Sequence, residues 1–257
     1  MAKWTPFPHA GDYTFDAASV KKNWPRLHAG DAEPLPKDAS VLEAWALFHA
    51  GEFQKACELG LQLGGAGITV ANKATCIYAN YLEAKESTRL ALFMEVAERA
   101  EKQAKDDPSN ANAYYWQAYA LGRYSQGISV AKALAQGLGG KVKEALETSI
   151  KLQPKHADAH IALGAFHAEV IDKVGSLIGS MTYGVKKDTS FKLFQEALTL
   201  NISSAIAMIE QANSMVMLEG DKRMKEATKL YEAAATSKAL DAMERLDVEM
   251  AKSELED

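Results

Sequence analysis

Apolar and polar residues follow one another with the period of an amphipathic helix along most of the chain. From Asp38 onward, apolar side chains recur every three or four residues, and glycine or proline interrupts them at helix-length intervals. Alanine, glutamate, lysine and leucine, which all favour helices, fill these segments. The pattern predicts an all-α chain with helices at about 38–50, 53–64, 71–85, 87–105, 110–122, 141–152, 156–173, 189–200, 203–218, 222–237 and 239–253.

Two similar segments mark places where one helix stops and another begins. Asp107–Tyr114 reads DPSNANAY, and Gln153–His160 reads QPKHADAH. Proline has no amide proton for a helix and disfavours helix in the residue before it, so it separates two helices. A repeated helix–stop–helix unit predicts a stacked array, because a single unit cannot bury its apolar face alone.

The two ends of the chain differ from its middle. Residues 1–36 mix aromatic residues with proline, a composition too interrupted for a long helix and too aromatic for a solvated tail. We expect an irregular strap with a short helix near 16–23; it lies on the body or, as a sharper alternative, forms a partner-binding arm. Residues 37–237 are predicted to form the repeat domain and 238–257 a C-terminal capping helix. That helix is expected to expose four acidic residues, Asp241, Glu244, Asp247 and Glu249, opposite an apolar face.

The repeated unit resembles the tetratricopeptide repeat (TPR), a helix pair of about 34 residues with the first-helix pattern W-x2-L-G-x2-Y. Small residues in this pattern let neighbouring helices approach, and aromatic residues fill the space between them. The resemblance implies a TPR-like helical-hairpin array, an α-α superhelix of compact form. The matching residues are His160, Leu163, Gly164 and His167; Tyr114, Ala118 and Leu121; Met208, Ala212 and Met215; Ala227, Tyr231 and Ala234; Phe194 and Ala197; and Gly51, Phe53 and Ala56.

The middle repeats are longer than the ordinary TPR unit. Pro108 and Pro154 are 46 residues apart, and Ile202 follows Pro154 by 48. The extra residues fall after the first helix of each pair, in glycine-containing inserts at 123–140 and 170–188. Such lengthened repeats look like the regulator of microtubule dynamics proteins and the bacterial TPR proteins similar to them. The chain also resembles the accessory TPR subunit of some tripartite solute transporters.

Composition narrows the class of protein further. The net charge of −5 argues against generic nucleic-acid binding, which needs a basic face. The N-terminus lacks the apolar stretch of a secretory signal, and no window approaches the roughly 18 apolar residues of a membrane helix. We therefore expect a cytoplasmic protein without a membrane or nucleic-acid partner. Cys57 and Cys76 are expected to be reduced core thiols.

Three features of the sequence suggest chemistry but fall short of a motif. His156, His160 and His167 lack the HExxH spacing of zinc enzymes, and two of them occupy packing positions of the repeat. The glycines before Lys141 lack the spacing of a phosphate-binding loop, and Val142 follows the lysine. Neither cysteine has a partner histidine nearby in the sequence. We predict no catalytic residues, no metal site and no cofactor.

The TPR resemblance implies a concave groove lined by the first helices of the repeats. Tyr115, Tyr119 and Arg123 follow one another at i, i+4 and i+8, which places two phenols and a guanidinium on one face. Such a face suits aromatic contacts and capture of a carboxylate or phosphate. Alternatively, the tyrosines support the insert or the strap. The predicted groove residues are Asn112, Tyr115, Tyr119, Arg123, Asp158, Glu169 and Trp45.

Two functions follow from this architecture. The first is a non-enzymatic protein–protein interaction scaffold, which holds a protein or peptide partner in its groove or assembles with itself. The alternative is a binding protein for a small apolar or acidic ligand, held in a cavity between the inserts 123–140 and 170–188.

Overall fold

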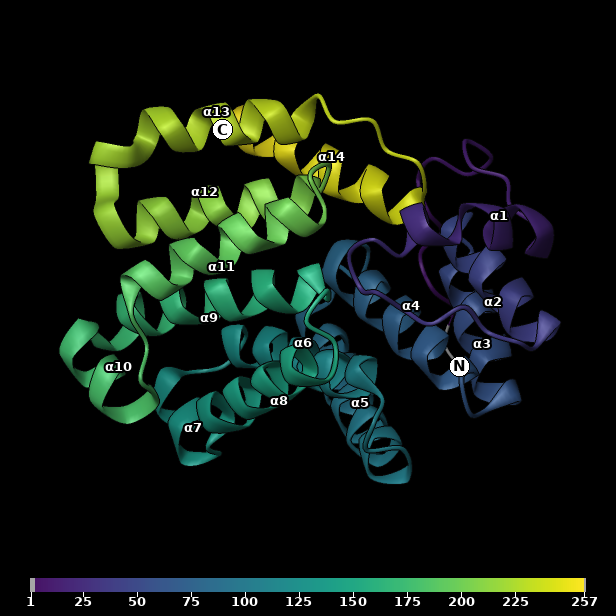
Figure 1. The fold of residues 1–257 in the computed structure, drawn as a ribbon, viewed down its shortest axis with the longest axis horizontal. Coiled ribbons are helices and arrows are strands. Elements are labelled where there is room, and N and C mark those ends of the chain that lie inside the picture. The colour runs from purple at the N-terminus through teal and green to yellow at the C-terminus, as the bar shows by residue number, and fades with distance from the viewer. Residues whose placement is uncertain (1–2, 257) are drawn as a thin grey trace. The chain divides into compact units, whose positions relative to one another are not determined.

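The computed structural model describes residues 3–256, and all the regular secondary structure in that range is helical (Figure 1). The chain divides into two compact units. Unit 1 runs to His28, resumes from Glu33 to Leu152 and includes Leu240–Met243. Unit 2 contains Ala29–Ala32, Gln153–Ala239 and the chain from Glu244 onward.

Unit 1 is a stack of helix pairs built from consecutive segments. Its first helices, α2, α4 and α6, pack on α3, α5 and α8 respectively, and α4 also contacts α2 and α6. The bounds are α1 Ala17–Leu27, α2 Ala39–His49, α3 Phe53–Leu63, α4 Gly67–Tyr81, α5 Glu86–Asp106, α6 Ala111–Gln126, α7 Val130–Ala135 and α8 Leu138–Leu152.

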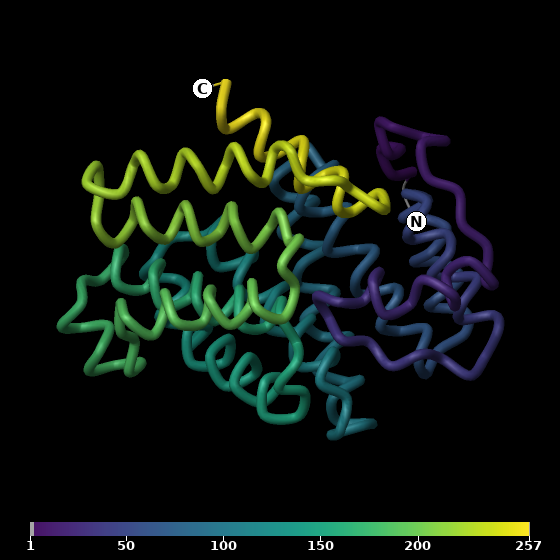
Figure 2. Tube along the Cα trace, turned by 45° about the horizontal axis from the view of Figure 1, so that its top comes forward, coloured from purple at the N-terminus to yellow at the C-terminus, as the bar shows by residue number. Residues whose placement is uncertain are grey.

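Unit 2 continues the same plan. Helix α9 packs on α11 and on α12, and α12 runs beside α13 in the opposite direction (Figure 1, Figure 2). The bounds are α9 Ala157–Val174, α10 Ser176–Tyr183, α11 Lys187–Leu200, α12 Ala205–Glu219, the 3-10 helix η1 Gly220–Arg223, α13 Met224–Ala235 and α14 Ala242–Glu256, whose first two residues belong to unit 1. The prediction of an all-α, TPR-like array of helix pairs is confirmed.

The two similar segments do begin helices, and the structure shows how. Asn110 caps α6 through a hydrogen bond from the amide of Ala113 to its side-chain oxygen (3.1 Å). His156 takes the same place before α9, where its Nδ1 accepts from the amide of Ala159 (3.1 Å). A cap two residues after each proline satisfies an amide that the new helix leaves without a partner.

Close helix packing occurs where the repeat pattern predicts it. A Cβ atom on Gly164 would lie only 3.0 Å from Cε2 of Phe194, so the glycine lets α9 and α11 approach each other. The Ser190 hydroxyl donates to the carbonyl of Gly164 at 2.7 Å in the same contact. Phe194 itself is completely buried.

The N-terminal segment lies on unit 1, and its aromatic residues are buried. The Trp4 ring stacks on Tyr78 with ring centroids 4.2 Å apart, and Phe7 packs against Gly51. Helix α1 is longer than the predicted 16–23, because it continues through Pro25 to Leu27 and buries Trp24. A capping box between Asp16 and Ser19 fixes its start.

The C-terminal helix differs from the expected amphipathic pattern. The four acidic residues were predicted to be exposed, but Asp241 and Asp247 are buried, so the prediction is wrong for these two. The helix begins at Ala242 rather than Ala239, which leaves Asp241 in the preceding turn with its carboxylate 2.6 Å from Nδ1 of His49. A carboxylate paired with an imidazole can be buried, whereas an unpaired one rarely is.

Each insert contains a short helix rather than an open loop. Helix α7 occupies the first insert, and α10 occupies the second. The second is bounded by Gly175 and Gly184, whose φ angles of +83° and +67° suit glycine far better than other residues. These glycines let the chain turn sharply at both ends of α10.

Candidate functional site

Helix α4 is the centre of the first-helix face of unit 1, and it is buried along nearly its whole length. Several of its buried side chains are polar, which is unusual for a core helix. Asn72 is completely buried, and Lys73 is 2 % exposed. Burying such groups is costly unless they are hydrogen-bonded or paired, so their partners define the chemistry of this face.

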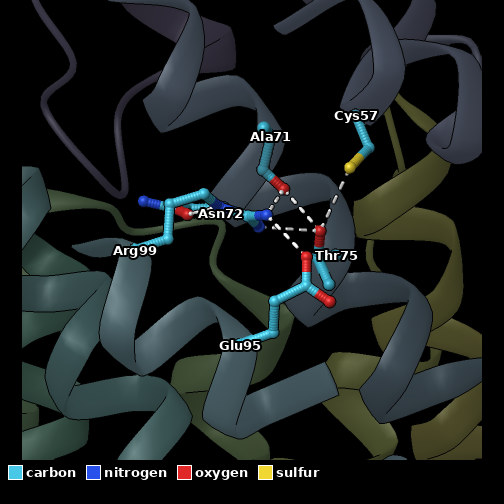
Figure 3. Close-up of polar contacts among 6 residues, drawn as sticks. All are labelled: Cys57, Ala71, Asn72, Thr75, Glu95 and Arg99. Atoms are coloured by element: carbon cyan, nitrogen blue, oxygen red, sulfur yellow. Dashed lines mark hydrogen bonds and ion pairs between the residues drawn. The ribbon is translucent and has the colours of Figure 1, made fainter. Parts of the chain in front are cut away.

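One group of partners surrounds Arg99, which reaches from α5 to α4 (Figure 3). Its Nε donates to Oδ1 of Asn72 at 2.6 Å, and its Nη2 lies 3.1 Å from the Thr75 hydroxyl. Its Nη1 pairs with Glu95 at 3.0 Å. All three guanidinium nitrogens donate within the cluster, so Arg99 bridges the two helices.

The amide group of Asn72 extends the same network. Its Nδ2 donates to Gln103 Oε1 at 3.2 Å, and Gln103 Nε2 donates to the Thr69 hydroxyl at 2.9 Å. This chain of hydrogen bonds connects α4 to α5 at two further points. Because both side chains are buried, the network sets the register of the two helices.

Both cysteines are buried free thiols, as the sequence predicts. Cys57 Sγ lies 3.3 Å from the Thr75 hydroxyl (Figure 3). Burial raises the pKa of the Cys57 thiol and of the Cys76 thiol. A raised pKa keeps a thiol protonated near neutral pH and therefore poorly nucleophilic.

A second buried polar group surrounds Trp45 on α2. His49 pairs with Asp241 through Nδ1, and its Nε2 lies 3.4 Å from Nε2 of His28. The ammonium group of Lys73 lies 5.6 Å from the centroid of the Trp45 ring. Aspartate, two imidazoles, a lysine and an indole are thus gathered inside unit 1.

The predicted groove residues of unit 1 divide into a covered and an accessible set. Trp45, Asn112 and Tyr115 are 0 %, 2 % and 5 % exposed. Tyr119 and Arg123 are half-buried, and the Arg123 guanidinium lies 5.4 Å from the Tyr119 ring centroid. The predicted i, i+4, i+8 face therefore changes along α6, from buried at its N-terminal half to partly exposed at its C-terminal half.

The chain's own N-terminal segment covers the buried part of this face. The Trp24 ring meets Trp45 edge-on at 5.9 Å, and its indole Nε1 donates to the carbonyl of Glu33 at 2.8 Å. The Glu33 carboxylate accepts a hydrogen bond from Asn112 Nδ2 at 2.6 Å. An aromatic side chain and a carboxylate thus bind two of the predicted groove positions.

Asp158 and Glu169, the remaining predicted groove residues, lie on α9 in unit 2 and are half-buried. The Asp158 amide donates to the carbonyl of Gly30 at 2.9 Å, and its carboxylate lies against the same glycine. Glu169 lies 3.9 Å from Lys173 one turn later.

The three histidines of α9 are buried and occupied by local hydrogen bonds. His156 caps the helix, and His160 Nδ1 lies 2.9 Å from the carbonyl of His156. His167 Nδ1 accepts from the amide of Lys186 at 2.9 Å, which fastens the end of the second insert. Over residues 3–256, no group of three or more His, Cys, Asp or Glu side chains is placed to hold a metal ion.

Sequence reasoning missed Lys73, Arg99 and Asp241. A single lysine or arginine on a predicted amphipathic helix usually lies on its solvated side, so neither residue gave a local signal. The only available signal was indirect. A stacked array implies that its middle helices have little solvated surface for a charge, and this is the only feature of the sequence that points to a buried Lys73.

Comparison with known proteins identifies the fold and shows which family part of the chain resembles. The family described as regulator of microtubule dynamics protein 1-3 matches residues 66–176, less than half of the chain but including the whole first insert. No curated protein matches the chain in sequence. A thermophilic TPR protein of Thermus thermophilus superposes with a TM-score of 0.58 at 15 % identity, over 83 % of this chain and 97 % of that chain.

These findings confirm the TPR-like fold and the predicted similarity to the regulator of microtubule dynamics proteins. Within residues 3–256, no helix is both long enough and apolar enough to cross a bilayer.

Proposed function

We propose that this chain is a non-enzymatic scaffold that binds a polypeptide partner on the first-helix face of unit 1. The observation behind the proposal is that this face already holds a polypeptide in cis. Residues 24–33 of the chain place an indole against Trp45 and a carboxylate against Asn112. A rigid face that binds one segment through an aromatic and an acidic anchor has the chemistry to bind another.

The partly exposed end of α6 offers the surface for that second segment. Tyr119 provides a half-buried phenol, and Arg123 provides a guanidinium stacked over the phenol ring. Tyrosine and arginine are the residues most enriched in the energetically important parts of interfaces. Arginine also binds carboxylates in a fixed planar geometry. We expect the partner to present an acidic segment with at least one aromatic residue.

A non-enzymatic role agrees with the state of the reactive groups. The two thiols are buried with raised pKa values, and the Arg99 guanidinium is used to bridge α4 and α5. These groups stabilise the scaffold. The proposal therefore assigns binding to the surface of α6 and stability to the polar interior.

The test is quantitative affinity purification from the native cell with wild-type protein and the double variant Tyr119→Ala/Arg123→Ala. The matched control, Tyr114→Ala/Arg89→Ala, removes the same two residue types from half-buried positions at other places in unit 1. We expect a partner that the wild type and the control recover equally and that the test variant loses by about tenfold or more. Equal recovery of every partner by all three proteins would remove this face from the proposal.

A further inference from the structure

Helix α10 of the second insert has its apolar residues on the outside. Leu177, Ile178 and Met181 are 75 %, 58 % and 80 % exposed. With about 100° of rotation per residue, these three positions fall within an arc of roughly 100° on one face. Three adjacent large apolar side chains directed to solvent differ from the single exposed leucines that are normal on protein surfaces.

The opposite face of α10 explains why these side chains are not in the core. Gly179 is buried there, and a Cβ atom on it would lie 2.8 Å from Val185 Cγ2 and 3.2 Å from Val170 Cγ1. Glycine and small branched side chains thus fill the side of α10 that faces the rest of unit 2. Turning the helix to bury its large residues would place their bulk where only a glycine fits.

The C-terminal end of α10 is fastened, so the outward direction of its apolar residues is part of the fold. Val185, just after the helix, is 1 % exposed, and the next amide, that of Lys186, donates to His167. Tyr183, the last residue of the helix, packs edge-on against Phe166 with ring centroids 6.2 Å apart.

The polar residues around the apolar face are uncharged or balanced. Ser176, Ser180 and Thr182 are exposed along the helix. The charges lie beyond its ends and include both signs: Asp172 and Lys173 precede the helix, and Lys186, Lys187 and Asp188 follow it. Lys173 pairs with Glu169 at 3.9 Å, and Lys187 pairs with Glu219 at 3.0 Å. A large apolar face bordered by serine and threonine is the composition of amphipathic helices that bind loosely packed lipid rather than anionic charge.

The size of the patch distinguishes a bilayer from a protein partner. A stable protein interface buries about 800 Å² on each side, whereas three side chains present on the order of a few hundred Å². That area is too small for a stable dimer of this chain. It suffices for weak, reversible adsorption to lipid, with an association constant on the order of 10⁴ M⁻¹, comparable to one fatty acyl chain.

We propose that α10 is a peripheral membrane contact that inserts Leu177, Ile178 and Met181 into the outer leaflet of a strongly curved phospholipid bilayer. Curvature opens gaps between head groups, and these gaps accept apolar side chains without electrostatic attraction. The helix lies in the plane of the interface and does not span the bilayer. This contact is independent of the polypeptide-binding face proposed for unit 1.

The test is flotation of the full chain with phosphatidylcholine vesicles of two sizes, small sonicated and large extruded, at equal lipid concentration. We expect binding to small vesicles that exceeds binding to large ones, and that falls about tenfold in Leu177→Ser/Met181→Ser. The matched control is Ile202→Ser/Met217→Ser, which removes two exposed apolar side chains from other parts of unit 2. The control is expected to bind like the wild type.

Adding phosphatidylserine to the vesicles should change binding by less than about twofold, because the charges near α10 are balanced. Circular dichroism should show the same melting temperature for all three proteins, because exposed side chains are removed in each variant.

Four results would overturn the proposal. The first is no binding of the wild type to small vesicles at millimolar lipid, and the second is equal loss in the test and control variants. The third is binding that depends on phosphatidylserine. The fourth is a concentration-dependent dimer in analytical ultracentrifugation that Leu177→Ser/Met181→Ser abolishes, since the patch would then bind a second copy of the chain.

Discussion

The contact of α4 with α5 in unit 1 and the contact of α9 with α11 in unit 2 are held together by different means. In unit 1, buried polar side chains bridge neighbouring helices, as Asn72, Arg99 and Gln103 do between α4 and α5. In unit 2, small residues let the helices approach each other, as Gly164 does against Phe194. Two apolar clusters of unit 2 include small side chains: one contains Ala205, Ile209, Ala234, Val248 and Ala251, and another contains Ile161, Phe194, Ala197 and Ala207.

This difference bears on how each unit responds to change. A hydrogen-bond network requires specific partners at fixed distances, so the loss of one member leaves another buried and unsatisfied. Packing of small residues requires only that volume be conserved, and many apolar replacements achieve this. We therefore expect the contact of α4 with α5 to be sensitive to loss of polar atoms and the contact of α9 with α11 to be sensitive to added volume.

The chain offers a convenient measurement for this comparison. All four tryptophans, Trp4, Trp24, Trp45 and Trp116, belong to unit 1. Tryptophan fluorescence therefore reports unfolding of unit 1. Hydrogen exchange followed by mass spectrometry resolves peptides of each unit separately.

The largest effect is expected for Asp241→Ala in unit 1. The change leaves His49 completely buried without the carboxylate that lies 2.6 Å from its Nδ1. Breaking a buried pair of this kind costs about 3–5 kcal/mol in the free energy of unfolding. Urea titration followed by tryptophan fluorescence measures it. The control Glu101→Ala removes an exposed carboxylate paired with Lys105, and we expect no measurable change. Similar midpoints for both variants would contradict the importance of the buried pair.

The next effect is expected for Arg99→Ala, which removes the bridge between α4 and α5. The acceptors on Asn72 and Thr75 lose their charged donor, so we expect the free energy of unfolding to fall by about 2–3 kcal/mol. The same fluorescence titration measures it, with Arg89→Ala on the same helix as control. Faster exchange should appear in the amides of α4 and α5 first. A uniform loss over both units would show that the network has no local role.

The contact of α9 with α11 should respond instead to added volume, and Gly164→Ala tests this. The new methyl group would lie about 3.0 Å from the Phe194 ring, closer than an ordinary contact. We therefore expect the free energy of unfolding to fall by about 2 kcal/mol. Hydrogen exchange of α9 and α11 measures it. In Gly140→Ala the new methyl meets no atom within 4 Å, and α8 should be unchanged or slightly stabilised. If the two substitutions behaved alike, close packing at Gly164 would not stabilise unit 2.

The smallest effect is expected for Tyr231→Phe, which removes a hydrogen bond to Asn213 between α12 and α13. At neutral pH the free energy of unfolding should fall by about 1 kcal/mol. Burial, with Glu254 and Glu210 nearby, raises the pKa of Tyr231 to about 12. In the unfolded chain the phenol of Tyr231 ionises near pH 10. The folded wild type therefore loses stability as pH rises from about 10 to about 12.

The phenylalanine variant has no hydroxyl to ionise there, so the difference in stability between the two proteins should narrow with rising pH. Amide hydrogen exchange is catalysed by hydroxide and is too fast to follow at alkaline pH, so urea titrations by circular dichroism are the better measurement. Parallel stability curves for the two proteins over this range would contradict the assignment of the shift to Tyr231.

The repeat architecture could be predicted from the sequence because its signals are local. The helical period, the prolines at 108 and 154 and the caps that follow them lie within a few residues of the features they determine. The i, i+4, i+8 spacing likewise placed Tyr115, Tyr119 and Arg123 on one face of α6.

The covering of the predicted groove residues and the direction of α10 could not be predicted in this way. Asn112 is buried because Glu33, which lies 79 residues earlier, reaches it. Large apolar residues normally predict the buried face of a helix, yet on α10 the buried position is Gly179. Both outcomes depend on which distant side chains occupy the neighbouring space, and the pattern of one helix does not contain that information.

The pair between His49 and Asp241 also constrains the order in which the protein can mature. The two residues are 192 positions apart, so a ribosome synthesises the imidazole long before its carboxylate. Unit 1 cannot complete its interior until the segment Leu240–Met243 has emerged, although most of its helices are available much earlier. A chain that stops before this segment would lack the last piece of its first unit, and quality-control proteases could distinguish it from the finished product.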